Sequence, residues 1–209
     1  MGFVSILSQK SDKIVIFPRN KPFGTLFVID KSEYNYLKER RITMNFNNFT
    51  IKAQEAVQEA VNLTQAHNGQ VIEPIHLLQA VMKVGENVTK FIFQKLGVNG
   101  QQIANVVARQ IESLPKVSGG NPYLSRESND VLQKAVQYSK EMGDEFVSIE
   151  PIILALLVVK STASSILKDA GVSEKELREA INELRKGERV TSQSSEDTYQ
   201  SLEKYAINL

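Results

Sequence analysis

The chain has 209 residues, enough for one or two compact domains with a hydrophobic core. Its 25 basic and 24 acidic residues leave a net charge of +1, so no overall field indicates nucleic acid or an acidic membrane as a partner. The lack of cysteine excludes disulfides, thiolate nucleophiles and cysteine zinc sites, and it is typical of a reducing compartment. No apolar run approaches the ~20 residues of a membrane span, so we expect a soluble, cytoplasmic protein.

Residues 1–43 differ in composition from the rest of the chain. Two β-prone runs, KIVIFPRN (13–20) and GTLFVID (24–30), are broken by proline and glycine, which predicts short strands or a hairpin. A signal peptide is not expected, because the first apolar run is too short. The composition changes at Met44. Two interpretations stay open, an upstream extension before a natural start at Met44 or a small accessory β element.

From Met44 to about residue 187 the apolar residues recur with helical spacing. Capping residues and prolines divide the first part of this region into four predicted helices. Their start signals are Thr50, Pro74, Asn87 and Asn99. Pro115 ends the fourth helix, and the segment PKVSGGNP (115–122) predicts a linker.

After this linker the same four helices recur. VLQKAV (131–136) matches AVQEAV (56–61) at a spacing of 75, and DAGVSEKEL (169–177) matches KLGVNGQQI (95–103) at a spacing of 74. Ile-Glu-Pro-Ile occurs at 72–75 and again at 149–152. We therefore predict an all-α fold, a tandem repeat of two four-helix units (about 49–114 and 124–187) packed with pseudo-twofold symmetry around one core. The second unit is expected to begin its helices at Ser125, Pro151 and Ser173, among others.

The remaining tail, 188–209, is polar and then weakly helical. ERVTSQSSED predicts a flexible linker, and TYQSLEKYAINL predicts the start of a further helix. We expect this tail to lead toward a domain that is absent from the chain.

Residues that could carry catalysis are few. The only histidines are His67 and His76, with Glu73 nearby, and their spacing matches no strong metal-ligand motif. We predict surface or capping histidines, no metal and no cofactor. The chain contains neither a Gly-x-Ser-x-Gly elbow nor a phosphate-binding loop. It also lacks the aromatic–basic interleaving of nucleic-acid binders and a basic amphipathic helix for membranes. A binding module, not an enzyme, is therefore expected.

Several segments resemble the amino-terminal domain of ClpB-type disaggregase chaperones. They are KAQEAVQEAVNLTQAHNGQVIEPIHLLQAV (52–81), the LGV and AGV helix ends, and LRKGERVTSQSSEDTYQSLEKYAINL (184–209). The resemblance covers about Met44–Leu209, and residues 1–43 have no counterpart. It implies a substrate-recognition module that binds exposed hydrophobic segments of unfolded or aggregated proteins. It also implies a homohexameric, ATP- and Mg-dependent stress-response parent with a co-chaperone system, of which this chain would be a monomeric part.

The resemblance also implies site residues. Functional positions of the family fall on Thr50, Asp144 and Glu150, although Thr50 and Glu150 are equally explained as helix-capping or first-turn residues. For the apolar part of a client groove between the two halves we expect Tyr138 and Pro151. Tyr138 is predicted to be half exposed with its ring toward the sixth helix, and the alternative is core packing at the rim.

The counterparts in the first half would be Leu63 and Pro74. An alternative function within the same fold is the adaptor- or tag-binding domain of a ClpC- or ClpA-type unfoldase that feeds a protease. ClpC-type domains place phosphoarginine-contacting glutamates where this sequence has Pro74 and Pro151. The missing pair favours the ClpB type.

Overall fold

The computed structural model describes residues 3–7, 13–18, 27–30, 46–117 and 121–195. The chain divides into two compact units, Met1–Asn45 and Phe46–Leu209. In the first unit, β1 (Phe3–Leu7), β2 (Lys13–Pro18) and β3 (Phe27–Asp30) form an antiparallel sheet in the order β1-β2-β3. The two predicted strands are confirmed, and β1 is an additional strand. Met44 and the predicted helix at the end of the tail lie outside the described residues.

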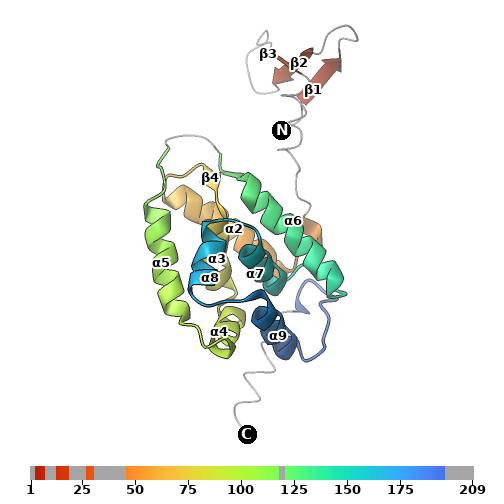
Figure 1. The fold of residues 1–209 in the computed structure, drawn as a ribbon. Coiled ribbons are helices and arrows are strands. Elements are labelled where there is room, and N and C mark those ends of the chain that lie inside the picture. The colour runs from red at the N-terminus through yellow and green to blue at the C-terminus, as the bar shows by residue number, and fades with distance from the viewer. Residues whose placement is uncertain (1–2, 8–12, 19–26, 31–45, 118–120, 196–209) are drawn as a thin grey trace. The chain divides into compact units, whose positions relative to one another are not determined.

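The described part of the second unit holds eight α-helices, one 3-10 turn and two short strands (Figure 1). In chain order they are η1 (Phe46–Asn48), α2 (Ile51–Ala66), β4 (Val71–Ile72), α3 (Pro74–Val84), α4 (Glu86–Lys95), α5 (Gly100–Glu112), β5 (Tyr123–Leu124), α6 (Arg126–Glu141), α7 (Ile149–Val158), α8 (Thr162–Asp169) and α9 (Glu174–Arg185). The predicted all-α class is confirmed for this unit.

Side-chain caps fix most of the helix starts. The Thr50 Oγ1 atom accepts a hydrogen bond from the Ala53 backbone N–H at 3.1 Å, and Asn99, Ser125 and Ser173 cap α5, α6 and α9 in the same way. The predicted cap at Asn87 is wrong, because α3 and α4 are separated by Gly85 alone, which ends one helix and begins the next. A side chain at Gly85 would meet the Ile149 side chain at 2.8 Å, so the bend between these helices lies close against α7.

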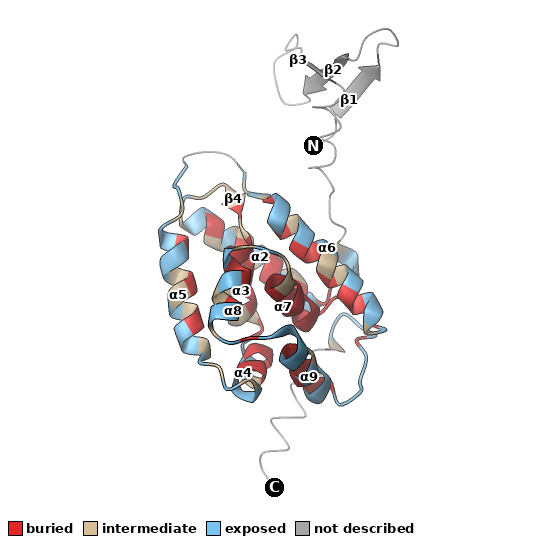
Figure 2. Cartoon of the chain, in the orientation of Figure 1, coloured by how far each residue is buried: buried red, intermediate tan, exposed pale blue. Residues whose placement is uncertain are grey.

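Two helices form the centre of the second unit. α7 is buried from its first residue to Leu157, and α3 is buried along most of its length, as the red segments of Figure 2 show. The other six helices pack around this pair. Within the described residues no single helix is both long and apolar enough to cross a membrane. α7 and α8 pass that test only as a pair, with a 92° bend between them.

Equivalent segments of the two repeats pair with each other. The Ser125 N–H donates to the Ile72 carbonyl at 3.0 Å, and the Thr50 N–H donates to the Val147 carbonyl at 2.9 Å. The two bonds are equivalent, because Thr50 corresponds to Ser125 and Ile72 to Val147 at the same repeat spacing. Each bond extends a parallel pairing, β4 with β5 in one case and Phe49 with Val147 in the other. The entry to the first helix of each repeat thus pairs with a loop of the other repeat, which is the predicted pseudo-twofold relation.

This register corrects the alignment of the repeated Ile-Glu-Pro-Ile motif. Glu73 is the N-cap of α3 and Pro74 its first residue, but α7 has Ser148 as its N-cap. Glu150 and Pro151 are therefore the second and third residues of α7, and Pro151 does not open that helix as predicted. The fold aligns Ile72 with Val147, whereas matching the letters would align Ile72 with Ile149. Identical letters in the two motifs thus occupy positions that are out of step in the fold.

Candidate functional site around a buried arginine

The five residues predicted to bind clients are all buried. The exposed fractions are 0% for Thr50, 3% for Tyr138, 9% for Asp144 and 0% for Glu150, and Pro151 is buried in the first turn of α7. A role in direct contact with a client stays a prediction for each of them. The structure shows what each side chain does inside the domain.

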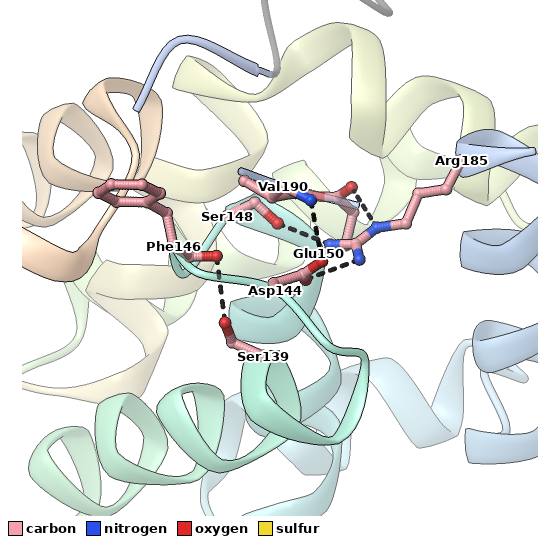
Figure 3. A network of polar contacts seen from close by, with 7 residues as sticks. All are labelled: Ser139, Asp144, Phe146, Ser148, Glu150, Arg185 and Val190. Atoms are coloured by element: carbon pink, nitrogen blue, oxygen red, sulfur yellow. Dashed lines mark hydrogen bonds and ion pairs between the residues drawn. The ribbon is translucent and has the colours of Figure 1, made fainter. Parts of the chain in front are cut away.

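Asp144 and Glu150 hold the guanidinium of Arg185, the last residue of α9 (Figure 3). Arg185 Nη1 lies 2.7 Å from Asp144 Oδ2, and Nε lies 3.0 Å from Glu150 Oε1. Arg185 Nη2 donates to the Ser148 hydroxyl at 2.9 Å. The arginine is only 6% exposed, so these charge-assisted bonds replace the water that the guanidinium loses on folding. Removing one member would leave uncompensated buried charge.

The loop between α6 and α7 is also bonded to the segment that follows this arginine. The segment after α9 turns back through Lys186 and Gly187, both with positive φ, so that Val190 reaches the loop 144–148. There the Val190 N–H donates to Asp144 Oδ1 at 2.9 Å, and the Val190 carbonyl accepts from Glu145 and Phe146. Asp144 therefore joins the end of α9, the returning segment and its own loop.

Thr50 contacts the same loop from the other repeat. Its backbone N–H bonds to Val147, its side chain caps α2, and the next N–H, that of Ile51, donates to the Gln193 carbonyl at 2.9 Å. The structure thus brings Thr50, Asp144 and Glu150 around one loop. All three are engaged in holding elements together, and this arrangement suits a structural junction better than proton transfer.

Arg185 is not among the predicted site residues, although the sequence carries a signal for it. Leu177, Ile181 and Leu184 form the apolar stripe of α9, and Arg185 follows at the next stripe position, one helical turn after Ile181. A cation on the buried face of a helix requires acidic partners. That requirement could have indicated that Asp144 and Glu150 belong to a buried ion cluster.

Tyr138 is buried at the rim, so the expectation of a half-exposed ring is wrong. The Lys134 Nζ atom lies 4.8 Å from the ring centroid and the Arg178 guanidinium 4.7 Å from it. Arg178 comes from α9 and is itself held by Glu174 at 2.8 Å. The ring therefore meets a cation of α9 that the α6 stripe alone did not reveal. Burial, together with the Glu174 charge, raises the pKa of the Tyr138 hydroxyl.

The histidines act as helix caps. His76 Nδ1 accepts a hydrogen bond from the Glu73 N–H at 3.0 Å, and His67 is the C-cap residue of α2. Burial, and then the neighbouring His67, lowers the pKa of His76 to about 4, so its ring is neutral at neutral pH. Among the residues that the structure describes, no group of three or more histidine and acidic side chains is arranged to hold a metal ion.

Two hollows open on the surface beside α5. One, of about 660 Å³, lies among α3, α4 and α5. Its lining combines the apolar Met82, Phe93 and Ala104 with polar and charged side chains, among them Lys83, Glu86 and Lys90. The other, of about 410 Å³, lies between α5 and α8, and Val106 and Ile166 from opposite repeats form its walls. Val98 lines both hollows. Of the predicted first-half counterparts, Leu63 is half-buried, and Pro74 is buried beside a third hollow of about 580 Å³.

Comparison with known proteins identifies the family to which this fold belongs. The model of the Clp repeat (R) N-terminal domain matches residues 48–170. The chaperone protein ClpB of Bacteroides thetaiotaomicron is 81% identical over 166 residues, which is 79% of this chain and 19% of that protein. ClpB of Porphyromonas gingivalis is 57% identical over the same shares of both chains. The chain thus spans about a fifth of the length of these curated relatives.

Solved structures share the fold. The Hsp104 N-terminal domain from Candida albicans matches with a TM-score of 0.65 at 22% identity, covering 72% of this chain and 99% of that one. A ClpV N-domain in complex with a VipB peptide matches with a TM-score of 0.55 at 16% identity, covering 66% and 86%. With the family model matching more than half of its residues, the chain belongs to the family of Clp repeat N-terminal domains.

Proposed function

We propose that this domain is the client-recognition module of a ClpB-type disaggregase and binds exposed apolar segments of unfolded or aggregated proteins. The observation that carries the proposal is the groove along α5, which comprises two hollows that share Val98 and Asn99 and combine apolar with polar side chains. Val106 and Ile166 contribute apolar walls from both repeats, as expected of a groove between halves. An open groove of this kind suits an extended segment held weakly.

The comparisons support this proposal at two levels. The similar full-length proteins are chaperones named ClpB, which favours the disaggregase over the ClpC- or ClpA-type alternative. A ClpV N-domain of the same fold forms a complex with a peptide, so the fold is compatible with peptide recognition. We further propose that the parent is cytoplasmic, homohexameric, dependent on ATP and Mg and assisted by co-chaperones. This domain itself would be monomeric and bind neither nucleotide, nucleic acid nor membrane.

The residues first expected to touch clients take a supporting role in this proposal. Asp144, Glu150 and Thr50 fix the loop 144–148, and Arg185 fixes α9 to it. A rigid junction keeps the two repeats in one arrangement, which a groove that draws residues from both repeats requires.

The proposal is tested by placing a charge in the groove. Val98→Glu sets a carboxylate where the two hollows meet, and we expect it to weaken binding of a permanently unfolded protein at least fivefold, because apolar contact supplies most of the affinity. Val61→Glu is the matched control: it is another half-buried valine, on α2, and lines neither hollow. Fluorescence anisotropy with a labelled client measures the affinity of both variants. Equal binding by the two variants, with native circular-dichroism spectra, would remove the groove from the proposal.

A further inference from the structure

The two repeats meet at two equivalent helix contacts. α4 packs against α9 at one of them, and α8 packs against α5 at the other (Figure 1). A spacing of 74 along the chain relates the two contacts. α4 ends at Lys95 and α8 at Asp169, and a glycine with positive φ follows each helix end. Asn99 and Ser173 then cap α5 and α9. The two contacts are therefore compared position by position.

The contact between α4 and α9 is closed. Lys95, at the end of α4, forms an ion pair with Glu183 of α9. The apolar side chains on these helices and on the turn before α9 are buried, with exposed fractions of 0% for Ile92, 3% for Val172 and 4% for Ala180. An ion pair and a closed apolar contact thus occur together in this half.

The equivalent contact between α8 and α5 is open. The counterparts of the three buried residues are Ile166, Val98 and Val106. All three are only half-buried, because they line the hollow of about 410 Å³ between α5 and α8. Nearly the same apolar side chains therefore lie in a closed contact in one half and around an open hollow in the other.

The ion pair of the closed contact has an unformed counterpart at the open one. Asp169 stands at the position of Lys95 and Arg109 at that of Glu183, so the charges are reversed but again opposite. Both side chains are exposed, and Asp169 lines the hollow. The Arg109 Nε atom donates to the Asn105 carbonyl of its own helix at 3.3 Å. Among the residues that the structure describes, neither charge forms an ion pair.

We propose that Arg109 and Asp169 form a latch that closes the hollow between α5 and α8. In the closed state the two side chains pair as their counterparts do, and the apolar walls of the hollow become buried against each other. The open state is the one that the structure shows. Closure leaves the junction around Arg185 intact, because that junction contains no residue of α5 or α8.

Opposing contributions balance the two states. Closure gains apolar contact and an ion pair, and a pair of exposed charges shifts such an equilibrium by no more than about fivefold. Val106 opposes closure, because the closed contact has the smaller Ala180 at that position and two more methyl groups must be accommodated. A ligand that fills the hollow selects the open state. The inference rests on the proposed function only for the identity of that ligand, a client segment bound at Val98.

Spin labels measure the two states without a client. The chain has no cysteine, so Asn105→Cys on α5 and Lys168→Cys on α8, both at exposed positions, carry the labels. Electron paramagnetic resonance should resolve a longer distance between the labels for the open state and a shorter one for the closed state. Arg109→Glu sets like charges against each other and should lower the ratio of short to long distances about fivefold. Lys140→Glu on α6 is the matched control, because it changes the charge equally on a helix that lines neither hollow, and it should leave the ratio unchanged.

Two further variants test the comparison between the halves. Arg109→Glu combined with Asp169→Lys reproduces the polarity of the closed contact and should restore the ratio. Val106→Ala copies the apolar side chain of the closed contact and should raise the ratio. The latch is overturned by a single distance in the chain that carries only the labels. It is also overturned if Arg109→Glu leaves the ratio unchanged, if the double substitution does not restore it, or if Val106→Ala does not raise it.

A client links the latch to the groove. A permanently unfolded protein added to the labelled chain should deplete the short distance, because it binds only the open state. A ratio that responds to the substitutions but not to the client would support the latch and count against the client groove. Failure of the latch and failure of the proposed function are therefore distinguishable.

Discussion

Replacing Arg185 by methionine tests whether the buried ion cluster holds the domain together. Methionine keeps much of the apolar stem but removes the bonds to Asp144, Glu150 and Ser148. Breaking a buried ion pair from one side typically costs about 3–5 kcal/mol, because the remaining charges lose their partner. For a domain of this size each kcal/mol lowers the melting temperature by roughly 2–4 °C. We therefore expect a loss of about 6–20 °C from these two relations.

The assay is urea and thermal unfolding followed by circular dichroism. Arg178→Met is the matched control. It removes an exposed pair with Glu174, worth about 0–1 kcal/mol, and the contact of the guanidinium with the Tyr138 ring, worth roughly 0.5–1 kcal/mol. Adding Asp144→Asn and Glu150→Gln to Arg185→Met should recover part of the lost stability by removing the stranded charge. A loss for Arg185→Met no larger than that of the control would mean that the buried ion cluster does not stabilise the domain.

Substitutions at three other positions test the packing and the pH dependence of the domain. Tyr138→Glu should lower stability by roughly 3–5 kcal/mol because it removes a buried aromatic ring, whereas Tyr138→Phe keeps the ring and should cost about 1 kcal/mol or less. Unfolding curves that rank the two variants the other way would place the ring at the surface. Because His76 has a folded pKa of about 4, below its ordinary 6.5, the unfolded chain binds the extra proton, so stability should fall as pH drops from about 6.5 toward 4. That fall should be smaller in His76→Gln, as pH-dependent urea midpoints would show. Gly85→Ala should destabilise by about 1–3 kcal/mol, since its new methyl group meets Ile149 at 2.8 Å; a neutral thermal midpoint would mean that the bend relaxes freely.

Local signals in the sequence were sufficient for most of the helices. Thr50, Asn99, Ser125 and Ser173 were all predicted as caps because a capping oxygen needs only the backbone two or three positions ahead. The predicted cap at Asn87 was wrong because tertiary packing sets the start of α4. The bend at Gly85 allows α3 and α4 to join with almost no loop, so no capping side chain is needed there.

The candidate site was predicted less well, because it depends on contacts between distant segments. The pairing of Thr50 with Val147 sets the register of the repeats, and it could not be read from the repeated Ile-Glu-Pro-Ile letters. Arg185 and Asp144 are far apart in the sequence, and so are Tyr138 on α6 and Arg178 on α9. Helical periodicity gives the face on which a residue lies, but it does not give the residue that covers that face.

Chemical-shift mapping is the direct test of our proposal that clients bind in the groove along α5. A ¹⁵N-labelled chain is titrated with a permanently unfolded protein, and amide shifts are followed residue by residue. We expect the largest changes at Val98, Val106 and Ile166, with small changes at the buried Asp144 and Glu150. Changes centred on Asp144 and Glu150 that leave Val98 unmoved would contradict it.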